Sequence, residues 1–168
     1  MRTSPADELV DILDDDGRVV GRTTRREMRA RRLAHRTCYI LVFNARGELF
    51  IHLRTPTKDV YPSHWDTAIG GVLSAGETFA QGAERETLEE LGVTMPLCEL
   101  FPVRYADTAT VVHGMVYRGV HDGPFSLQSE EIVRGEFVPI ADVATRAARE
   151  PFCPDGLAVL AAYRRTAG

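Results

Sequence analysis

The apolar positions of the chain fall into short runs separated by turn-forming residues, a pattern typical of β-strands. Residues 9–13 and 18–20 are predicted to form a hairpin, because the turn-forming run 15–17 joins them. The apolar run 37–43 and the alternating stretch 48–54 predict a second hairpin. Further strands are expected at 65–69, 97–105, 110–120 and 136–140.

One helix is marked at both ends by capping signals. Thr78 and Gln81 fit a capping box, and Gly92 stands where a left-handed cap would end the helix, so we predict a helix from about 78 to 91. Two shorter helices are expected at 140–149 and 156–165. Strands and helices are interspersed without the regular alternation of a doubly wound sheet. The predicted class is therefore α+β, a mixed β-sheet packed against helices in a single domain over residues 1–168.

The segment between the two predicted hairpins is rich in arginine. Residues 22–36 are expected to form a short solvated helix, so that the N-terminal hairpin and this basic segment together span about 8–36. Two interpretations remain open: the arginines form an exposed charged face, or some of them contact phosphate groups of a ligand. The seven are Arg22, Arg25, Arg26, Arg29, Arg31, Arg32 and Arg36.

Composition and charge exclude several classes of partner. With 168 residues, of which 44% are apolar, the chain can bury one core of ordinary size. Its formal charge is −4 and its pI about 5.7, so no general attraction to nucleic-acid polymers or anionic lipid is expected. Any binding of phosphate must therefore be local.

Nothing in the sequence indicates a membrane or secreted protein. The longest apolar run, 39–43, is far short of the ~20 residues that span a bilayer, and the N-terminal residues lack a signal-peptide hydrophobic region. The cysteines Cys38, Cys98 and Cys153 are odd in number and widely spaced, as expected of reduced thiols. We expect a soluble protein with a cytoplasmic location.

The predicted helix at 78–91 concentrates carboxylates on one side. At about 100° per residue, Glu86 and Glu90 lie about 40° apart, and Glu89 falls about 60° to the other side of Glu86. Carboxylates in the last helical turn oppose the helix dipole at a cost of roughly 0.3 to 1 kcal/mol each. A cation is expected to compensate for them. A different arc, which should pack against the protein, holds Ala80, Ala83, Thr87 and Leu91.

A hard divalent cation suits this carboxylate face. Arg85 can pair with only one or two of the carboxylates, whereas Mg²⁺ takes oxygen ligands of this kind. Gly70 and Gly71 allow the backbone to come close to the ion, and Glu77 at the helix entrance suits a supporting contact with Arg85. The alternative is a solvated glutamate-rich face, which is the usual reading of such a helix taken alone.

The spacing of these residues resembles the Nudix box, G-x5-E-x7-R-E-U-x-E-E-x-G-U, over residues 71–93. The resemblance implies the Nudix fold, a mixed β-sheet sandwiched between α-helices, and a hydrolase that binds Mg²⁺ or Mn²⁺. It also implies that Glu86 and Glu90 are the principal metal ligands, that Glu89 is a further ligand or base, and that the Gly70 carbonyl faces the metal. Thr87 departs from the pattern at a bulky apolar position, which affects packing. The matching positions are Gly71, Glu77, Arg85, Glu86, Glu89, Glu90, Gly92 and Val93.

A wider resemblance covers most of the chain and raises a rival function. Segments 10–12, 33–36, 58–65 and 123–131 resemble the bacterial Nudix branch related to isopentenyl-diphosphate isomerase. That isomerase motif has a cysteine where Gly70 stands and a histidine where Val72 stands, and one of its two metal-binding histidines corresponds here to Met28. The other is matched by His35, whose role stays open between a structural hydrogen bond and a metal or phosphate contact. Hydrolysis is the better interpretation.

The remaining site expectations concern phosphate binding and the activation of water. Arg36, Arg54 and Lys58 are expected to bind substrate phosphates. Glu131, or its neighbour Glu130, lies in a region from which related Nudix enzymes supply the activating glutamate, with Glu89 as the alternative base. The catalytic set is therefore predicted as Arg85, Glu86, Glu89, Glu90 and Glu131.

The predicted function is metal-dependent hydrolysis of a phosphoanhydride or phosphoester bond in a small nucleoside-diphosphate-linked or related diphosphate. An isomerase-like enzyme and a catalytically silent nucleotide-binding module are the alternatives. Tyr61, Trp65 and Phe125 either stack on a base or pack within the protein. The oligomeric state stays open, with a homodimer through the N-terminal hairpin or a sheet edge as one alternative, and no polymer or membrane partner is expected.

Overall fold

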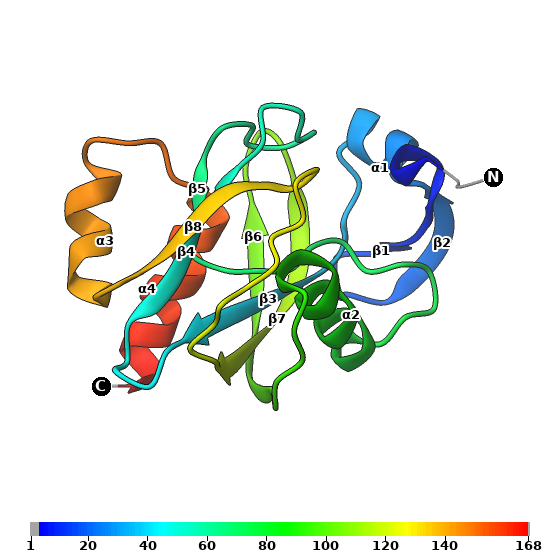
Figure 1. Cartoon of the computed structure of the whole chain (residues 1–168). Helices are drawn as coiled ribbons and strands as arrows, with labels where there is room; N and C mark the ends of the chain where they lie inside the picture. Colours follow the sequence, from blue (N-terminus) through cyan, green and yellow to red (C-terminus); the bar gives the residue numbers. More distant parts are fainter. Residues whose placement is uncertain (1–3, 168) are drawn as a thin grey trace.

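The computed structural model describes residues 4–167 and is built around a mixed six-stranded sheet (Figure 1). The strand order is β5-β4-β3-β7-β6, and β8 pairs with β4. The pair β3·β7 is parallel and the other pairs are antiparallel, which makes the sheet mixed. Its strands are β3 (His35–Phe43), β4 (Leu49–Arg54), β5 (Trp65–Asp66), β6 (Cys98–Ala106), β7 (Val111–Val120) and β8 (Ile132–Val138).

Helices cover both faces of this sheet, and each face has its own apolar core. On one face Ile40 and Val42 of β3 pack with α2 (Phe79–Leu91). On the other face Leu41 and Phe43 pack with α3 (Ile140–Ala147) and α4 (Pro154–Ala167). A strand buried on both faces is apolar along its length, as β3 is. The predicted α+β class with a sheet between helices is confirmed.

The capping signals of α2 act as predicted. The Thr78 side chain accepts from the Gln81 N–H while the Gln81 side chain accepts from the Thr78 N–H, and Gly92 ends the helix with φ 69°. Thr87 is buried, and its hydroxyl donates to the Ala83 carbonyl at 2.8 Å, so this departure from the motif leaves no polar group unpaired. The predicted packing arc is wrong at Ala80, which is exposed; Gly82 is buried instead.

The N-terminal hairpin is confirmed, but the helix predicted after it is shorter. β1 (Leu9–Leu13) pairs with β2 (Val19–Thr24), and only α1 (Arg25–Ala30) of the segment 22–36 is helical. Residues 22–24 are extended because they pair with β1, and the Thr24 side chain then caps α1. In Figure 1 this unit lies at the end of the molecule opposite α3 and α4. The homodimer through this hairpin stays a prediction.

Besides the first hairpin, two predicted strands differ from the observed ones by three or more residues at one end. Of residues 65–69 only Trp65 and Asp66 form a strand, β5, that pairs with β4. The chain then turns alongside β3, where Ile69 makes an isolated β-bridge with Ile40 and Gly70 adopts φ 132°. This conformation is outside the extended region that a strand needs. The strand expected at 136–140 begins earlier, at Ile132, because it pairs along the whole of β4.

Among the residues that the structure describes, no helix has the length and apolar character needed to cross a bilayer. The three cysteines are free thiols; Cys38 and Cys153 are buried and Cys98 is exposed. The cytoplasmic location stays a prediction.

Candidate active site

Two glutamates of α2 point toward the backbone at the start of the box. Glu90 is 5% exposed, and its Oε2 accepts from the Gly70 N–H at 2.9 Å. Glu86 lies against Gly71, where an added Cβ would stand 3.1 Å from Glu86 Oε1. The two carboxylates therefore share a narrow space that a side chain at position 71 would crowd.

This carboxylate pair is short of positive charge within the protein. Burial raises the pKa of Glu86 to about 7, although Arg85 acts against it. Burial and the charge of Glu86 also raise the pKa of Glu90 well above its ordinary range. Both ionised forms are thus costly unless a cation lies between or beside them. Hard oxygen donors that lack a counter-charge fit a divalent cation such as Mg²⁺ or Mn²⁺.

Arg85 ties the helix to the loop that precedes it. Its Nε and Nη2 donate to the Glu77 carboxylate at 2.7 and 2.8 Å, which is the contact expected from the sequence. Its Nη1 donates to Glu86 at 3.1 Å and to Glu89 at 3.2 Å. Burial raises the pKa of Glu77, but the hydrogen bonds from Arg85 and the Ser74 N–H outweigh this and lower it. Arg85 therefore fixes one oxygen of Glu86 and leaves the rest of that carboxylate to other partners.

Glu89 stands apart from the buried pair. Its side chain is 48% exposed and its carboxylate turns to Arg85. Across residues 4–167, no three His, Cys, Asp or Glu side chains are already grouped around one metal position. The structure thus brings two of the three predicted carboxylate ligands together, with the Gly70 backbone beside them.

The predicted residues Lys58 and Glu131 meet each other next to the buried pair. The Lys58 Nζ donates to a Glu131 carboxylate oxygen. Glu131 is close enough to raise the pKa values of Glu86 and Glu90, after the larger effect of burial. The neighbouring Glu130 is exposed, and its carbonyl accepts from the Thr55 hydroxyl. Of the two glutamates considered for this loop, Glu131 is the one that faces the site.

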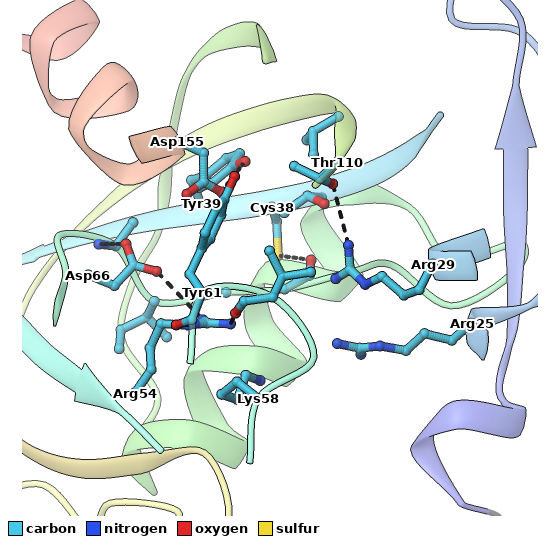
Figure 2. A pocket seen from close by; sticks show the side chains of 17 residues that line it. Arg25, Arg29, Cys38, Tyr39, Arg54, Lys58, Tyr61, Asp66, Thr110 and Asp155 are labelled. Carbon is cyan, nitrogen blue, oxygen red and sulfur yellow. Dashed lines mark hydrogen bonds and ion pairs between the residues drawn. The ribbon is translucent and has the colours of Figure 1, made fainter. Parts of the chain in front are cut away.

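A pocket of about 60 Å³ begins at Gly70 and Gly71 and extends toward α1 (Figure 2). Lys58 and Arg54, which are predicted to bind substrate phosphates, line it, and the binding itself stays a prediction. Arg54, however, already donates to the Val60 and Tyr61 carbonyls at 2.8 and 3.3 Å. Its role here is to hold the loop between β4 and β5 in place.

Arg36 is not among the residues that line this pocket. It donates to Asp11 Oδ2 at 2.7 Å and lies over the Phe79 ring at 5.7 Å. The positive charge of Arg36 favoured phosphate binding in the sequence analysis. In the structure this charge pairs with Asp11 of the N-terminal hairpin.

The pocket also contains residues that the sequence does not single out, together with two of the seven arginines whose contact with phosphate the sequence leaves open. The far wall is acidic and aromatic: the Tyr39 hydroxyl donates to Asp155 at 3.0 Å, and burial raises the pKa of Asp66 to about 7. At the other end are Arg25 and Arg29, one helical turn apart. Their i,i+4 spacing was the available signal, since it places both on one face of α1.

Three aromatic residues were candidates either for stacking on a base or for packing within the protein, and the structure places them differently. Tyr61 lines the pocket. Trp65 is buried and stacked on Phe152, and Phe125 packs edge-on against Phe50 with ring centroids 5.0 Å apart. Trp65 and Phe125 therefore belong to the packing of the protein.

The groups that an isomerase would need are absent or inert. A Cβ at Gly70 would lie 2.1 Å from the Cys38 carbonyl oxygen, so a cysteine cannot occupy this position without a backbone shift. Burial raises the pKa of the Cys38 thiol to about 12. His35 is buried with its Nδ1 2.9 Å from the Leu33 carbonyl, and burial lowers its pKa to about 4. Its surroundings are those of a neutral structural histidine.

The loop of the box is fastened to the N-terminal hairpin by one buried carboxylate. Asp11 is 4% exposed and accepts from the Gly76 N–H at 2.9 Å, from Arg36 at 2.7 Å and from Arg22 at 2.9 Å. Gly76 directly precedes Glu77, the partner of Arg85. Asp11 therefore positions the loop on which the Arg85 network depends.

We expect the substitution Asp11→Asn to lower the free energy of unfolding by about 1.5 to 3 kcal/mol, because it weakens charge-assisted hydrogen bonds at a buried position. Turnover should fall by ~10-fold, since the loop that supports Arg85 loses its anchor. Urea denaturation and steady-state kinetics measure the two effects. The control is Asp7→Asn, an exposed partner of Arg26, which should change stability by less than ~0.5 kcal/mol. Equal stabilities for the two variants would contradict the role of Asp11.

Comparison with known proteins identifies a family. The model of the NUDIX domain matches residues 33–157. The chain is 39% identical to the uncharacterised Nudix hydrolase PA4841 of Pseudomonas aeruginosa, over 93% of each chain. It is 34% identical to the uncharacterised Nudix hydrolase YfcD of Escherichia coli, over 94% of this chain and 87% of the relative.

Solved structures agree with this match. DR0079 from Deinococcus radiodurans superposes with a TM-score of 0.80 at 26% identity, over 91% of this chain and 97% of that one. The Nudix domain of Shewanella oneidensis NrtR, solved with ADP ribose, has the same fold, with a TM-score of 0.64 at 18% identity over 79% of this chain and 88% of that one. The chain belongs to the Nudix family, as a hydrolase that acts on phosphorus-containing anhydrides.

Proposed function

We propose that this protein is a divalent-metal-dependent hydrolase of a small diphosphate compound, with Glu86 and Glu90 as its principal metal ligands. One observation carries the proposal: Glu90 is buried, Glu86 beside it is only 13% exposed, and the two carboxylates lack a full counter-charge within the protein. Such a pair is stable in its ionised form when a cation joins it. The Gly70 carbonyl and Glu89 are proposed as further ligands.

The cation, when bound, shields phosphate charge and makes a water molecule more acidic. Arg85 then keeps Glu86 and Glu89 at fixed positions through its contacts with both carboxylates and with Glu77. Because positioning and charge stabilisation supply most of the acceleration in phosphoryl transfer, this clamp is proposed as part of the catalytic machinery.

Glu131 is proposed as the residue that accepts the proton of the attacking water. It lies beside Glu86 and Glu90, and Lys58 pairs with it. Glu89 remains the alternative base, because among the three predicted ligands on α2 its carboxylate is the most exposed. Lys58 also lines the pocket, where its ammonium group can turn to a substrate phosphate once Glu131 has accepted a proton.

The substrate class is testable with a product screen. Purified protein is incubated with nucleoside di- and triphosphates, nucleotide sugars, dinucleotide cofactors or isopentenyl diphosphate, with Mg²⁺, with Mn²⁺ or with a chelator. We expect hydrolysis of at least one diphosphate compound in the presence of metal and none with the chelator. Rearrangement of isopentenyl diphosphate, or tight nucleotide binding without any product, would overturn the proposal in favour of an isomerase or a binding module.

A further inference from the structure

Two arginines of α1 share one carboxylate at the mouth of the pocket. The Nε atoms of Arg25 and Arg29 both donate to Asp59 Oδ2, each at 3.1 Å. Arg25 makes a second, longer contact with Oδ1 at 3.4 Å, and Arg29 Nη1 donates to the Thr110 hydroxyl at 3.3 Å. The group is thus assembled from α1, the loop between β4 and β5, and the turn before β7.

This arrangement has more positive charge and more donors than Asp59 can satisfy. Two guanidinium groups offer about ten N–H donors, whereas one carboxylate accepts about four hydrogen bonds. Burial lowers the pKa of Arg29, and the charge of Arg25 lowers it further, although Asp59 acts against both effects. Two partly buried cations close together with one counter-ion are stabilised when a second anion is present.

Both guanidinium groups face the pocket. Their side chains are each 20% exposed, and both residues belong to its lining. Figure 2 shows Arg25 and Arg29 entering from the side opposite Asp66 and Asp155. The acidic wall therefore does not supply the missing counter-charge. It holds a cation of its own, since Arg54 lies 3.8 Å from Asp66.

A purely structural ion pair is the alternative explanation. It accounts for Asp59 and one arginine, which together would fasten α1 to the loop. It does not account for the second arginine on the same carboxylate oxygen, nor for a pocket beside both. Arg26, which lies between them in the sequence, is a surface residue: its side chain is 66% exposed and pairs with Asp7 at 3.0 Å.

We propose that Arg25 and Arg29 form an anion subsite that binds a phosphate group of the substrate at the α1 end of the pocket. The proposal rests on the proposed hydrolysis of a diphosphate compound. It narrows the substrate class to compounds that place an anionic group at the α1 end of the pocket, away from Glu86 and Glu90. The pocket has a volume of about 60 Å³, which suits a small anion such as one phosphate group. Both arginines precede the matched family domain at 33–157, whereas their partners Asp59 and Thr110 lie within it.

The first test measures anion binding without catalysis. Melting temperature is followed against inorganic phosphate in the presence of a chelator, at constant ionic strength kept with chloride. We expect phosphate to raise the melting temperature of the wild type and of Arg26→Gln. The shift should be lost in Arg25→Gln and in Arg29→Gln, because each removes charge-assisted donors. An unchanged shift in both of these variants, or none in the wild type, would overturn the subsite.

The second test assigns the subsite to the substrate. With the substrate found by the product screen, Arg25→Gln and Arg29→Gln should raise KM by ~10-fold or more and change kcat by less than ~3-fold, whereas Arg26→Gln should change neither. Loss of the phosphate shift with an unchanged KM would overturn the assignment to the substrate. The phosphate shift should survive in Glu90→Gln, so a failure of the proposed catalysis is distinguishable from a failure of the subsite.

Discussion

Replacement of Glu90 by glutamine is expected to lower turnover by at least ~10²-fold and to leave the protein folded. Glutamine has the same shape and keeps an oxygen that can accept from the Gly70 N–H, but it cannot carry the charge that a metal ligand needs. Burial and Glu86 already disfavour the ionised form of Glu90 in the metal-free protein. The variant should therefore melt at the same temperature as the metal-free wild type or above it.

The matched control for this experiment is Glu84→Gln. Glu84 is exposed on the same helix, so the substitution removes one carboxylate of α2 without touching the buried pair. Turnover of Glu84→Gln should stay within ~3-fold of the wild type, as expected of a surface change. Near-normal turnover in Glu90→Gln, or an equal loss of turnover in both variants, would contradict the assignment of Glu90 as a metal ligand.

The substitution Gly70→Ala is expected to destabilise the fold by more than about 4 kcal/mol. The new Cβ would stand 2.1 Å from the Cys38 carbonyl oxygen and 2.9 Å from its carbon, and both are backbone atoms that cannot rotate away. The φ of 132° adds strain for any residue with a side chain. For a chain of this size the melting temperature should fall by ~10 °C or more, as scanning calorimetry would measure.

The comparison variant Gly47→Ala measures the cost of a side chain at a positive φ where no steric clash occurs. Gly47 has φ 77° with nothing within 4 Å of an added Cβ, so only the conformational penalty of ~1 kcal/mol is expected there. If Gly70→Ala cost no more than Gly47→Ala, the close approach of residue 70 to β3 would be wrong.

Local signals predicted the parts of the site that are close together in the sequence. The box, its capping residues and the contact between Glu77 and Arg85 all lie within residues 71–93. Helical periodicity therefore placed Glu86 and Glu90 correctly on one face. It placed Glu89 on the same face, but the angle of a residue around the helix axis does not determine how far its side chain is buried. Glu89 is 48% exposed and pairs with Arg85.

Parts of the site that depend on long-range contacts could not be predicted in the same way. The segment 22–36 has helical composition, yet residues 22–24 pair with β1 and only α1 is helical. Arg36 was assigned to phosphates, but folding places Asp11 next to it. Arg25 and Arg29 are brought together by their contacts with Asp59, which is about thirty positions away in the sequence.

The most direct test of the central claim, that Glu86 and Glu90 hold a divalent cation, is Mn²⁺ binding to the wild type and to Glu90→Gln. Electron paramagnetic resonance of free Mn²⁺ measures it without any substrate. The wild type should bind Mn²⁺, and Glu90→Gln should bind it at least ~10-fold more weakly, with Glu84→Gln unchanged. Equal affinities in all three proteins would contradict the claim, as would wild-type hydrolysis that continues in excess chelator.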